Sequence, residues 1–167
     1  DGSFFLAGEF LDTVQFGDNL IISAGGTDVF VAKMTGAGVP EWSARIGAAD
    51  YDFVQKAATD NEGNVLVTGY FYGNTQIGTD NYTSFGSQDV YLAKFNPDGE
   101  FLWSFRAGGT MADYITGLSA DQDNNITVAG YYYNSMVFGD TTLVATSSSD
   151  IYIAKFDPAG SLLWIRS

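Results

Sequence analysis

The chain has 167 residues, 46% of them hydrophobic and 16% aromatic, which is enough to bury the core of about one folded domain. It carries 7 Lys and Arg against 20 Asp and Glu, and the net charge of −13 disfavours nucleic acid or an anionic membrane as a partner. The absence of His and Cys excludes catalytic triads with a His base, His- or Cys-ligated metals, thiolate nucleophiles and disulfides.

The apolar runs of the sequence and its first residues bear on where the protein is located. No apolar run approaches the roughly 20 residues of a membrane-spanning helix, so no membrane span is predicted. The sequence starts at Asp1, without a Met and without a charged and then apolar leader. We interpret this start as the result of a removed signal segment, or as the edge of a piece of a larger protein.

The predicted elements repeat along the chain with a period of 61 residues. The segments Asp28–Lys33, Asp89–Lys94 and Asp150–Lys155 share the pattern Asp-apolar-aromatic-apolar-Ala-Lys. The same offset aligns further identical residues without an insertion or deletion: Gly8, Gly69 and Gly130; Gly17, Gly78 and Gly139; Gly38, Gly99 and Gly160; and Trp42, Trp103 and Trp164. A register kept over the whole chain indicates a tandem repeat.

The period divides the single domain 1–167 into three units, which we name unit 1 (1–46), unit 2 (47–107) and unit 3 (108–167). Unit 2 is complete, and unit 3 is one residue shorter. Unit 1 lacks the positions that match residues 47–61, so the chain opens in the middle of a unit.

Unit 2 has the pattern of four strands joined by turns, rich in β-forming residues and Gly. The predicted strands are 53–59, 65–72, 89–95 and 100–106, with a tight turn at 96–99 and a small hairpin around Gly78. No segment has a helical period long enough to predict a helix.

Four antiparallel strands in tandem are the plan of a β-propeller blade, so we predict an all-β, incomplete propeller of three blades, the first without its first strand. A blade has two apolar faces and must stack on a neighbour. A β-solenoid fits less well, because its rungs span roughly 20–30 residues without tight hairpins. Since propellers have about 4–8 blades, we expect partners in further blades of the same protein or in other copies of the chain.

Several segments carry a family resemblance. The following residues resemble the bacterial β-propeller repeat called SBBP: Asp52–Val54, Ala58, Asp60–Phe71, Asp113–Ile115 and Gly130–Tyr132. The resemblance implies a secreted or cell-surface bacterial protein, of a kind frequent in the Bacteroidetes, without enzymatic activity. The run Ala154–Trp164 also resembles the strand–turn–strand of quinoprotein-type propeller blades. The long stretch between the second and third strands departs from the usual, shorter SBBP unit.

The recurring residues are interpreted as structural. The three Trp are predicted to wedge between blades rather than to stack on sugars, because each follows a turn Gly in an apolar strand. Lys33, Lys94 and Lys155 are predicted to end their strands and to pair with an acidic group on a neighbouring blade. The alternative, a ring of cations for an anionic ligand, fits the acidic surroundings less well.

Acidic residues at strand starts and turns predict no catalytic or metal site. Two sets recur at strand starts and are interpreted as structural groups: Asp28, Asp89 and Asp150, and Asp52 and Asp113. The segments 60–64 and 121–125 place oxygens at alternate positions, but they are shorter than a calcium loop and lack its distal Glu. We interpret them as ordinary turns and predict no cofactor.

These observations predict a non-enzymatic cell-surface or secreted module that acts as a scaffold or protein-interaction platform. The alternative is a carbohydrate-binding module that uses exposed Tyr131, Tyr132 and Tyr133, so that other surface proteins and glycans are both possible partners. An enzyme domain is the least favoured reading, because no carboxylate or Ser cluster accompanies the lack of His and Cys.

Overall fold

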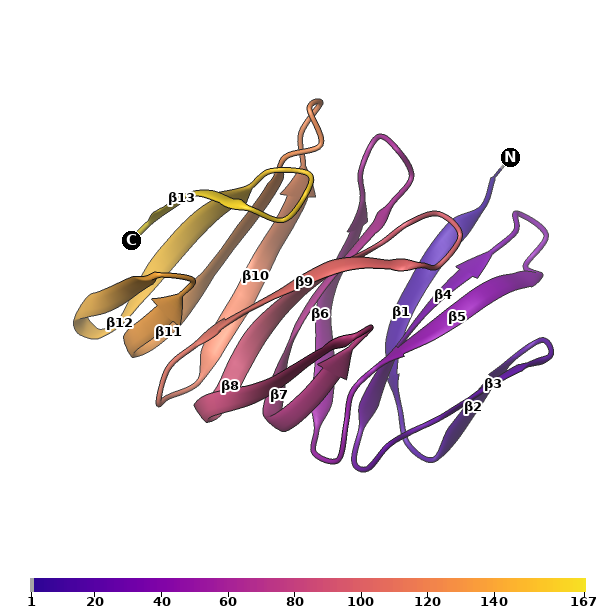
Figure 1. Cartoon of the computed structure of the whole chain (residues 1–167), viewed down its shortest axis with the longest axis horizontal. Helices are drawn as coiled ribbons and strands as arrows, with labels where there is room; N and C mark the ends of the chain where they lie inside the picture. The colour runs from indigo at the N-terminus through magenta and orange to yellow at the C-terminus, as the bar shows by residue number, and fades with distance from the viewer. Residues whose placement is uncertain (1) are drawn as a thin grey trace.

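The structure is a computed structural model that describes residues 2–167 (Figure 1). These residues form strands and no helix, which confirms the all-β prediction. No helix that could cross a membrane is therefore found among them. The strands are β1 (Phe4–Phe10), β2 (Thr13–Phe16), β3 (Asn19–Ile22), β4 (Asp28–Met34), β5 (Pro40–Ile46), β6 (Asp52–Thr59), β7 (Val65–Ile77), β8 (Asp80–Phe95), β9 (Phe101–Gly108), β10 (Asp113–Ala120), β11 (Ile126–Phe138), β12 (Thr141–Phe156) and β13 (Leu162–Arg166).

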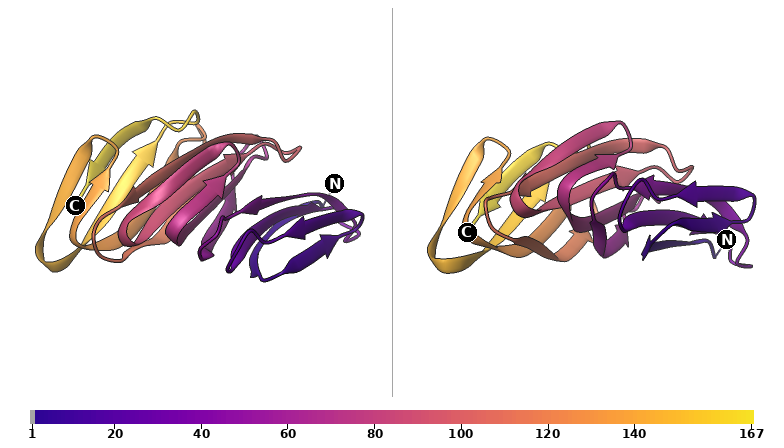
Figure 2. Two further views of the ribbon diagram at one scale, coloured as in Figure 1. Left: turned by 60° about the horizontal axis from the view of Figure 1, so that its bottom comes forward. Right: turned by 90° about the horizontal axis from the view of Figure 1, so that it is seen from below.

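Each unit forms an antiparallel sheet whose strands follow the order of the chain, and short pairings of β5 with β7 and of β9 with β11 link the three sheets into one of 11 strands. The order is β1-β4-β5 in unit 1, β6-β7-β8-β9 in unit 2 and β10-β11-β12-β13 in unit 3. Figures 1 and 2 show the three sheets side by side along the long axis of the molecule. Among residues 2–167, unit 1 has no counterpart of β6 or β10, and the sheets do not close into a ring.

The stretch between the second and third predicted strands differs from the prediction. Instead of a separate small hairpin, β7 and β8 continue through it to a turn at Gly78 and Thr79, and β11 and β12 do the same in unit 3. The pairing register shifts at Gly73 and Asn134, whose φ angles are 58° and 57°. Gly and Asn adopt positive φ at low cost. In unit 1 the matching Asp12, with φ 61°, separates the hairpin β2-β3 as a sheet of its own.

Two hydrophobic cores lie between consecutive sheets. Side chains alternate along a strand, so β7 contributes Val65 and Val67 to the core shared with unit 1 and Leu66 to the core shared with unit 3. The first of these cores includes Val29 and Val31 of β4. The sheet of unit 2 is therefore buried on both faces, as the near-continuous apolar runs of its strands predict.

Two of the recurring glycines are required by a close backbone approach. A Cβ on Gly69 would lie 1.8 Å from the carbonyl oxygen of Phe53, and one on Gly130 would lie 1.8 Å from that of Tyr114. Both carbonyls belong to the first strand of their unit. Any side chain at these positions would push the first strand away from the second.

Candidate interaction surface

The tryptophan column lies at the junctions between units. Trp42 of unit 1 packs against the tight turn of unit 2, where its Nε1–H donates to the carbonyl oxygen of Pro97 over 2.9 Å. Trp103 of unit 2 makes the same contact with Pro158 of unit 3 over 3.1 Å. One junction geometry is therefore built twice, from residues that are 61 positions apart.

The lysine column meets the same turns, but its acidic partners differ from the prediction. Lys94 donates to the carbonyl oxygen that the tryptophan of its unit also binds, and it forms a 2.9 Å ion pair with Asp60. Lys33 likewise shares the acceptor of its tryptophan and pairs with Glu41 at 2.8 Å. Both acids belong to the same unit as their lysine, so the predicted acid on a neighbouring blade is wrong. The neighbouring unit supplies a backbone carbonyl instead. This carbonyl belongs to the proline of its tight turn, which lies within hydrogen-bond distance of the lysine.

The ion pairs of units 2 and 3 differ in burial. Lys94 and Asp60 are buried, whereas Lys155 and Asp121, which pair at 2.8 Å, are partly exposed. Burial alone raises the pKa of Asp60, but hydrogen bonds from Asn64 and Lys94 outweigh it and hold that pKa below its ordinary value. The hydrogen bond from Lys155 is the main cause that lowers the pKa of Asp121 to about 2.

The aspartates at strand starts share one local contact. Each accepts the backbone N–H of the residue four positions earlier; they are Asp28, Asp52, Asp89, Asp113 and Asp150. Asp28 and Asp89 also lie near an arginine of their own unit, Arg45 at 3.5 Å and Arg106 at 3.1 Å.

Each junction brings two of these carboxylates together from consecutive units. Burial raises the pKa of Asp52 to about 6, and the nearby charge of Asp28 adds to the rise. Burial also raises the pKa of Asp113 to about 7, again with a contribution from the preceding unit, through Asp89. Asp89 itself has its pKa raised to about 6 by burial, despite Arg106. The carboxyls at the junctions therefore bind protons at a higher pH than an ordinary Asp does.

The outer face of unit 1 has the residues of a junction without a neighbour among residues 2–167. Phe4 and Leu6 of β1 are 42% and 40% exposed. The residues 61 positions later, Val65 and Val67 of β7, are fully buried against unit 1. The side chains at these matched positions are all apolar. The difference is that unit 2 has a preceding unit and unit 1 has none among the described residues.

The outer face of unit 3 shows the complementary situation. Ile151 and Ile153 of β12 are 75% and 42% exposed. The matching Val90 and Leu92 of β8 are 2% and 1% exposed, because unit 3 covers them. The two outer faces therefore expose apolar side chains at positions that are buried at the junctions between units.

Trp164 and Gly38 are the two members of the junction without a described counterpart. Trp164 is partly exposed at the outer face of unit 3. A Cβ on Gly99 or Gly160 would lie 2.6 Å from the indole of the preceding unit, whereas a Cβ on Gly38 would meet no described atom within 4 Å. The turn of unit 1 is therefore open at the position where the other two turns receive a tryptophan.

The three tyrosines considered for sugar stacking do not form one exposed platform. Tyr132 is buried, with its hydroxyl 2.7 Å from the Ser167 hydroxyl, so its predicted exposure is wrong. Tyr131 and Tyr133 are half-buried, and the ring of Tyr131 stacks on Tyr114 at 4.6 Å between centroids. Strand alternation places the middle tyrosine on the opposite face from the other two.

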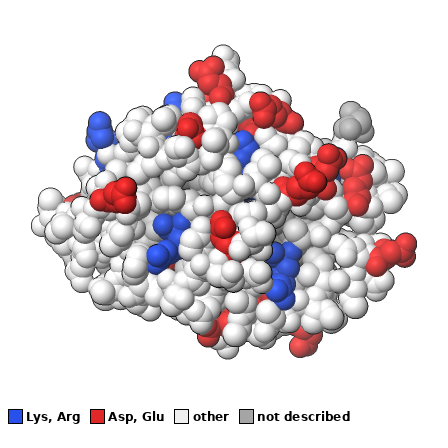
Figure 3. All heavy atoms as spheres, in the orientation of Figure 1, with Lys and Arg blue, Asp and Glu red and all other residues white. Residues whose placement is uncertain are grey.

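The acidic turns use their oxygens internally. Oδ1 of Asp60 accepts the N–H groups of Glu62 and Asn64, and Oδ1 of Asp121 accepts those of Asp123 and Asn125. Within residues 2–167, no group of three or more acidic side chains is placed to hold a metal ion. On the face drawn in Figure 3, Asp and Glu side chains are scattered rather than gathered in one place.

The contact that sequence reasoning misses is the proline carbonyl shared by a tryptophan and a lysine. Pro97 and Pro158 recur 61 positions apart, and unit 1 has Gly36 at the matching position. That recurrence was the available signal, but it does not reveal that the carbonyl faces the preceding unit.

Comparison with known proteins supports a propeller repeat. Residues 41–74, which include Trp42 and β6, match the family described as Beta-propeller repeat (SBBP). The chain is also 27% identical over 170 residues to an uncharacterised WD repeat-containing protein of Acanthamoeba polyphaga mimivirus. That alignment covers 82% of this chain and 12% of the relative, so the chain spans a small part of the relative's length.

Proposed function

We propose that this chain is a protein-interaction module built of β-propeller blades, and that its two outer faces are its main interaction surfaces. Units 2 and 3 are then complete four-stranded blades, and unit 1 is a blade whose first strand is not among the described residues. The antiparallel sheets, the SBBP match and the WD repeat-containing relative support this proposal.

The observation that carries the proposal is the contrast in burial at matched positions. Val90 and Leu92 are covered by a following unit, while Ile151 and Ile153 present the same kind of surface without one. An apolar face of this kind is buried at both junctions between units. The same face is expected to bind a partner where no unit covers it.

The partner that fits these faces is another unit of the same repeat. In a head-to-tail contact, Ile151, Ile153 and Trp164 of one unit would meet Phe4 and the Gly38 turn of the next. Such a contact is heterologous, so it closes a ring or extends a chain of units. Trp164 would donate to the carbonyl of Gly36, which matches the proline acceptor of the other two junctions. A non-catalytic role and a secreted or cell-surface location remain parts of the prediction made from the sequence.

Light scattering over a range of concentrations tests this proposal. We expect the wild-type chain to show a mass that rises above 18.0 kDa with concentration. Ile151→Asp should return the mass to that of the monomer, because a charge on the outer face is buried only at a large cost. Leu102→Asp is the matched control, since Leu102 is an exposed apolar residue of β9 in unit 2, the unit between the other two. A wild-type chain that stays monomeric throughout contradicts the proposal.

A further inference from the structure

Three buried oxygen atoms at the junction between units 1 and 2 have no hydrogen-bond partner among residues 2–167. They are Oδ1 of Asp28, Oδ1 of Asp52 and Oγ1 of Thr75. Each of these residues is at most 1% exposed, and they belong to β4, β6 and β7, so both units contribute. Proteins rarely bury such atoms unpaired, because the hydrogen bonds to water that they lose are not replaced. The group therefore points to a ligand.

The backbone brings the two carboxyl groups to one place. The N–H of Asp52 donates to the carbonyl oxygen of Thr27, the residue before Asp28, over 2.7 Å. A Cβ on Gly47 would lie 2.6 Å from Oδ1 of Asp28. The next residue, Ala48, donates its N–H to Oδ2 of Asp52 over 3.2 Å. The two carboxyls therefore lie against the same short segment, residues 47 and 48.

The hydroxyl of Thr75 and the carboxylate of Asp28 both act on Asp52. Burial is the main cause that raises the pKa of Asp52 to about 6; the Thr75 hydroxyl lowers it, and the Asp28 charge raises it further. Both of the latter effects depend on proximity. The carbonyl of Gln76, next to Thr75, also accepts the N–H of Gly47 over 2.9 Å. The three oxygen atoms therefore belong to one site.

The junction between units 2 and 3 retains only part of this group. Asp89 matches Asp28, but both of its carboxylate oxygens accept a hydrogen bond. Met136 takes the place of Thr75, and a thioether is a poor ligand for a hard cation. Among the matching atoms, only Oδ1 of Asp113 has no partner within the described residues. The second junction is therefore an internal control for the first.

The site at the first junction has more negative than positive charge. Arg45 places one cation beside Asp28, with Nε 3.5 Å from Oδ2. Asp50 adds a third carboxylate near Asp52. A water molecule can donate to two of the unpaired oxygens, but it leaves this charge in place. A hard cation takes carboxylate and hydroxyl oxygens as ligands and neutralises them.

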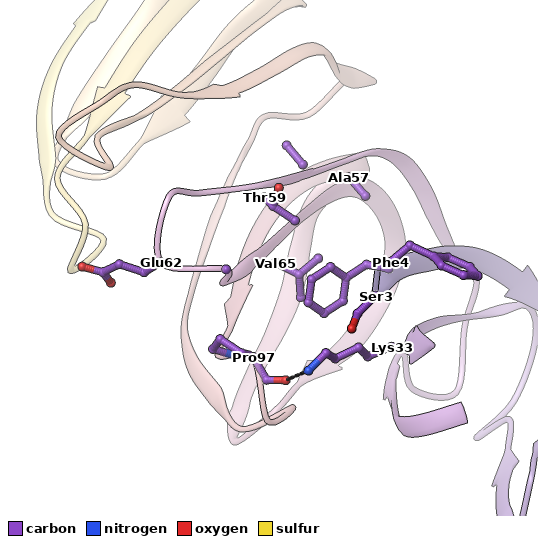
Figure 4. A pocket seen from close by; sticks show the side chains of 11 residues that line it. Ser3, Phe4, Lys33, Ala57, Thr59, Glu62, Val65 and Pro97 are labelled. Atoms are coloured by element: carbon purple, nitrogen blue, oxygen red, sulfur yellow. Dashed lines mark hydrogen bonds between the residues drawn. The ribbon is translucent and has the colours of Figure 1, made fainter. Parts of the chain in front are cut away.

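The opposite end of the same junction already has its charge paired. Lys33, five positions after Asp28 on β4, donates to the carbonyl oxygen of Pro97 over 3.2 Å (Figure 4). It also pairs with Glu41 at 2.8 Å. Five residues of a strand span roughly 16 Å, so Lys33 is too far along β4 to neutralise Asp28.

We propose that Asp28, Asp52 and Thr75 bind a hard divalent cation that links unit 1 to unit 2. Each side chain supplies the oxygen atom that has no hydrogen-bond partner, and water completes the coordination, as is usual for Ca²⁺ and Mg²⁺ in sites with few protein ligands. The site differs from the acidic turns 60–64 and 121–125, whose oxygens are used internally. The inference goes beyond the proposed interaction function and does not depend on it.

Isothermal titration calorimetry of the full chain tests this inference. The chain is treated with EDTA, desalted, and titrated separately with CaCl₂ and MgCl₂ in about 0.15 M NaCl, which screens diffuse attraction to the acidic surface. We expect one ion per chain, with a dissociation constant of about 1 mM or lower for the preferred ion, and a melting temperature that rises with its concentration. If neither ion shows saturable binding below about 10 mM, protons or water satisfy the group and the inference is overturned.

Two substitutions locate the bound ion. Asp52→Asn should weaken binding at least tenfold, because it removes a charged ligand while the amide oxygen still accepts the N–H of Ala48. Thr75→Val should weaken it roughly tenfold and keep the fold, because valine has the shape of threonine and removes only a hydroxyl that has no partner. Far-UV circular dichroism checks that both variants are folded.

Asp113→Asn is the matched control at the second junction. It removes the same kind of buried carboxylate, so it should leave the affinity for the ion and the stoichiometry unchanged. An affinity that falls equally in Asp52→Asn and Asp113→Asn, or that changes in neither Asp52→Asn nor Thr75→Val, places the ion elsewhere and overturns the inference.

The two proposals fail separately. Light scattering of Ile151→Asp reports on the outer faces, whereas the titration reports on groups buried between units 1 and 2. A chain that associates through Ile151 but binds neither ion keeps the proposed function and loses the cation site.

Discussion

Unit 2 and unit 3 carry the same recurring residues in different surroundings. Trp103 packs against the turn of the next unit, while Trp164 is partly exposed. Lys94 forms its ion pair in a buried position, while Lys155 forms the same pair near solvent. Residues that are identical in the repeat are therefore expected to contribute differently to stability. A following unit excludes water from Trp103 and Lys94 but not from Trp164 and Lys155.

The two lysines test this comparison with the largest expected effect. Lys94→Met should lower the free energy of unfolding by about 4 kcal/mol, since it leaves the buried Asp60 carboxylate without its counter-charge. Lys155→Met should change stability little, because its pair is solvated. Urea unfolding of both variants measures the difference. Equal losses would show that burial does not separate the two pairs.

The two tryptophans test the packing part of the comparison. Trp103→Ala should cost about 3 kcal/mol, because the indole fills the junction between units 2 and 3 and donates to Pro158. Trp164→Ala should cost less than about 1 kcal/mol at concentrations where the chain is monomeric. Thermal unfolding is the measurement. If Trp103→Ala leaves the melting temperature unchanged and abolishes a binding activity, the indole is a ligand site instead.

A pH series tests the paired carboxylates. The pKa of Asp113 in the folded chain, about 7, lies above its ordinary value of 3.8, so the folded state binds this proton more tightly than the unfolded state. Stability should therefore fall as pH rises from about 4 to 7, by at most about 1.4 kcal/mol per pH unit for each such group. Asp60 acts in the opposite direction, because its lowered pKa makes its stabilisation disappear below about pH 4. The optimum of stability should therefore lie at about pH 4, where the first loss has not begun and the second has not set in.

Asp113→Asn checks which group is responsible. The amide cannot ionise but still accepts the N–H of Gly109, so the variant should gain stability at pH 8 and lose part of the pH dependence. Asp150→Asn is the matched control at the outer face of unit 3, where no following unit is described. A pH profile that Asp113→Asn leaves unaltered would assign the effect to other groups.

The predicted strands agree with the structure where the local pattern is strong. The apolar run of Val65–Tyr72 and the β-branched and aromatic content of 89–95 indicate the inner parts of β7 and β8. The parts of β7 and β8 between Gly73 and the turn at Gly78 were predicted as a separate hairpin. A bulge at Gly73 leaves no periodic pattern in the sequence that would show the strands continuing. Tyr132 was predicted exposed, because three adjacent tyrosines do not show which face of the strand is covered.

The sequence by itself determined the all-β class, the 61-residue period and the residues that recur. These are local properties, carried by β-forming residues, turn glycines and an unbroken register. Only the tertiary structure decided that Trp42 and Lys33 share a carbonyl of the next unit and that each junction brings two carboxylates together. These depend on which sheets meet face to face, and a repeat has the same local sequence whether or not a neighbour is present.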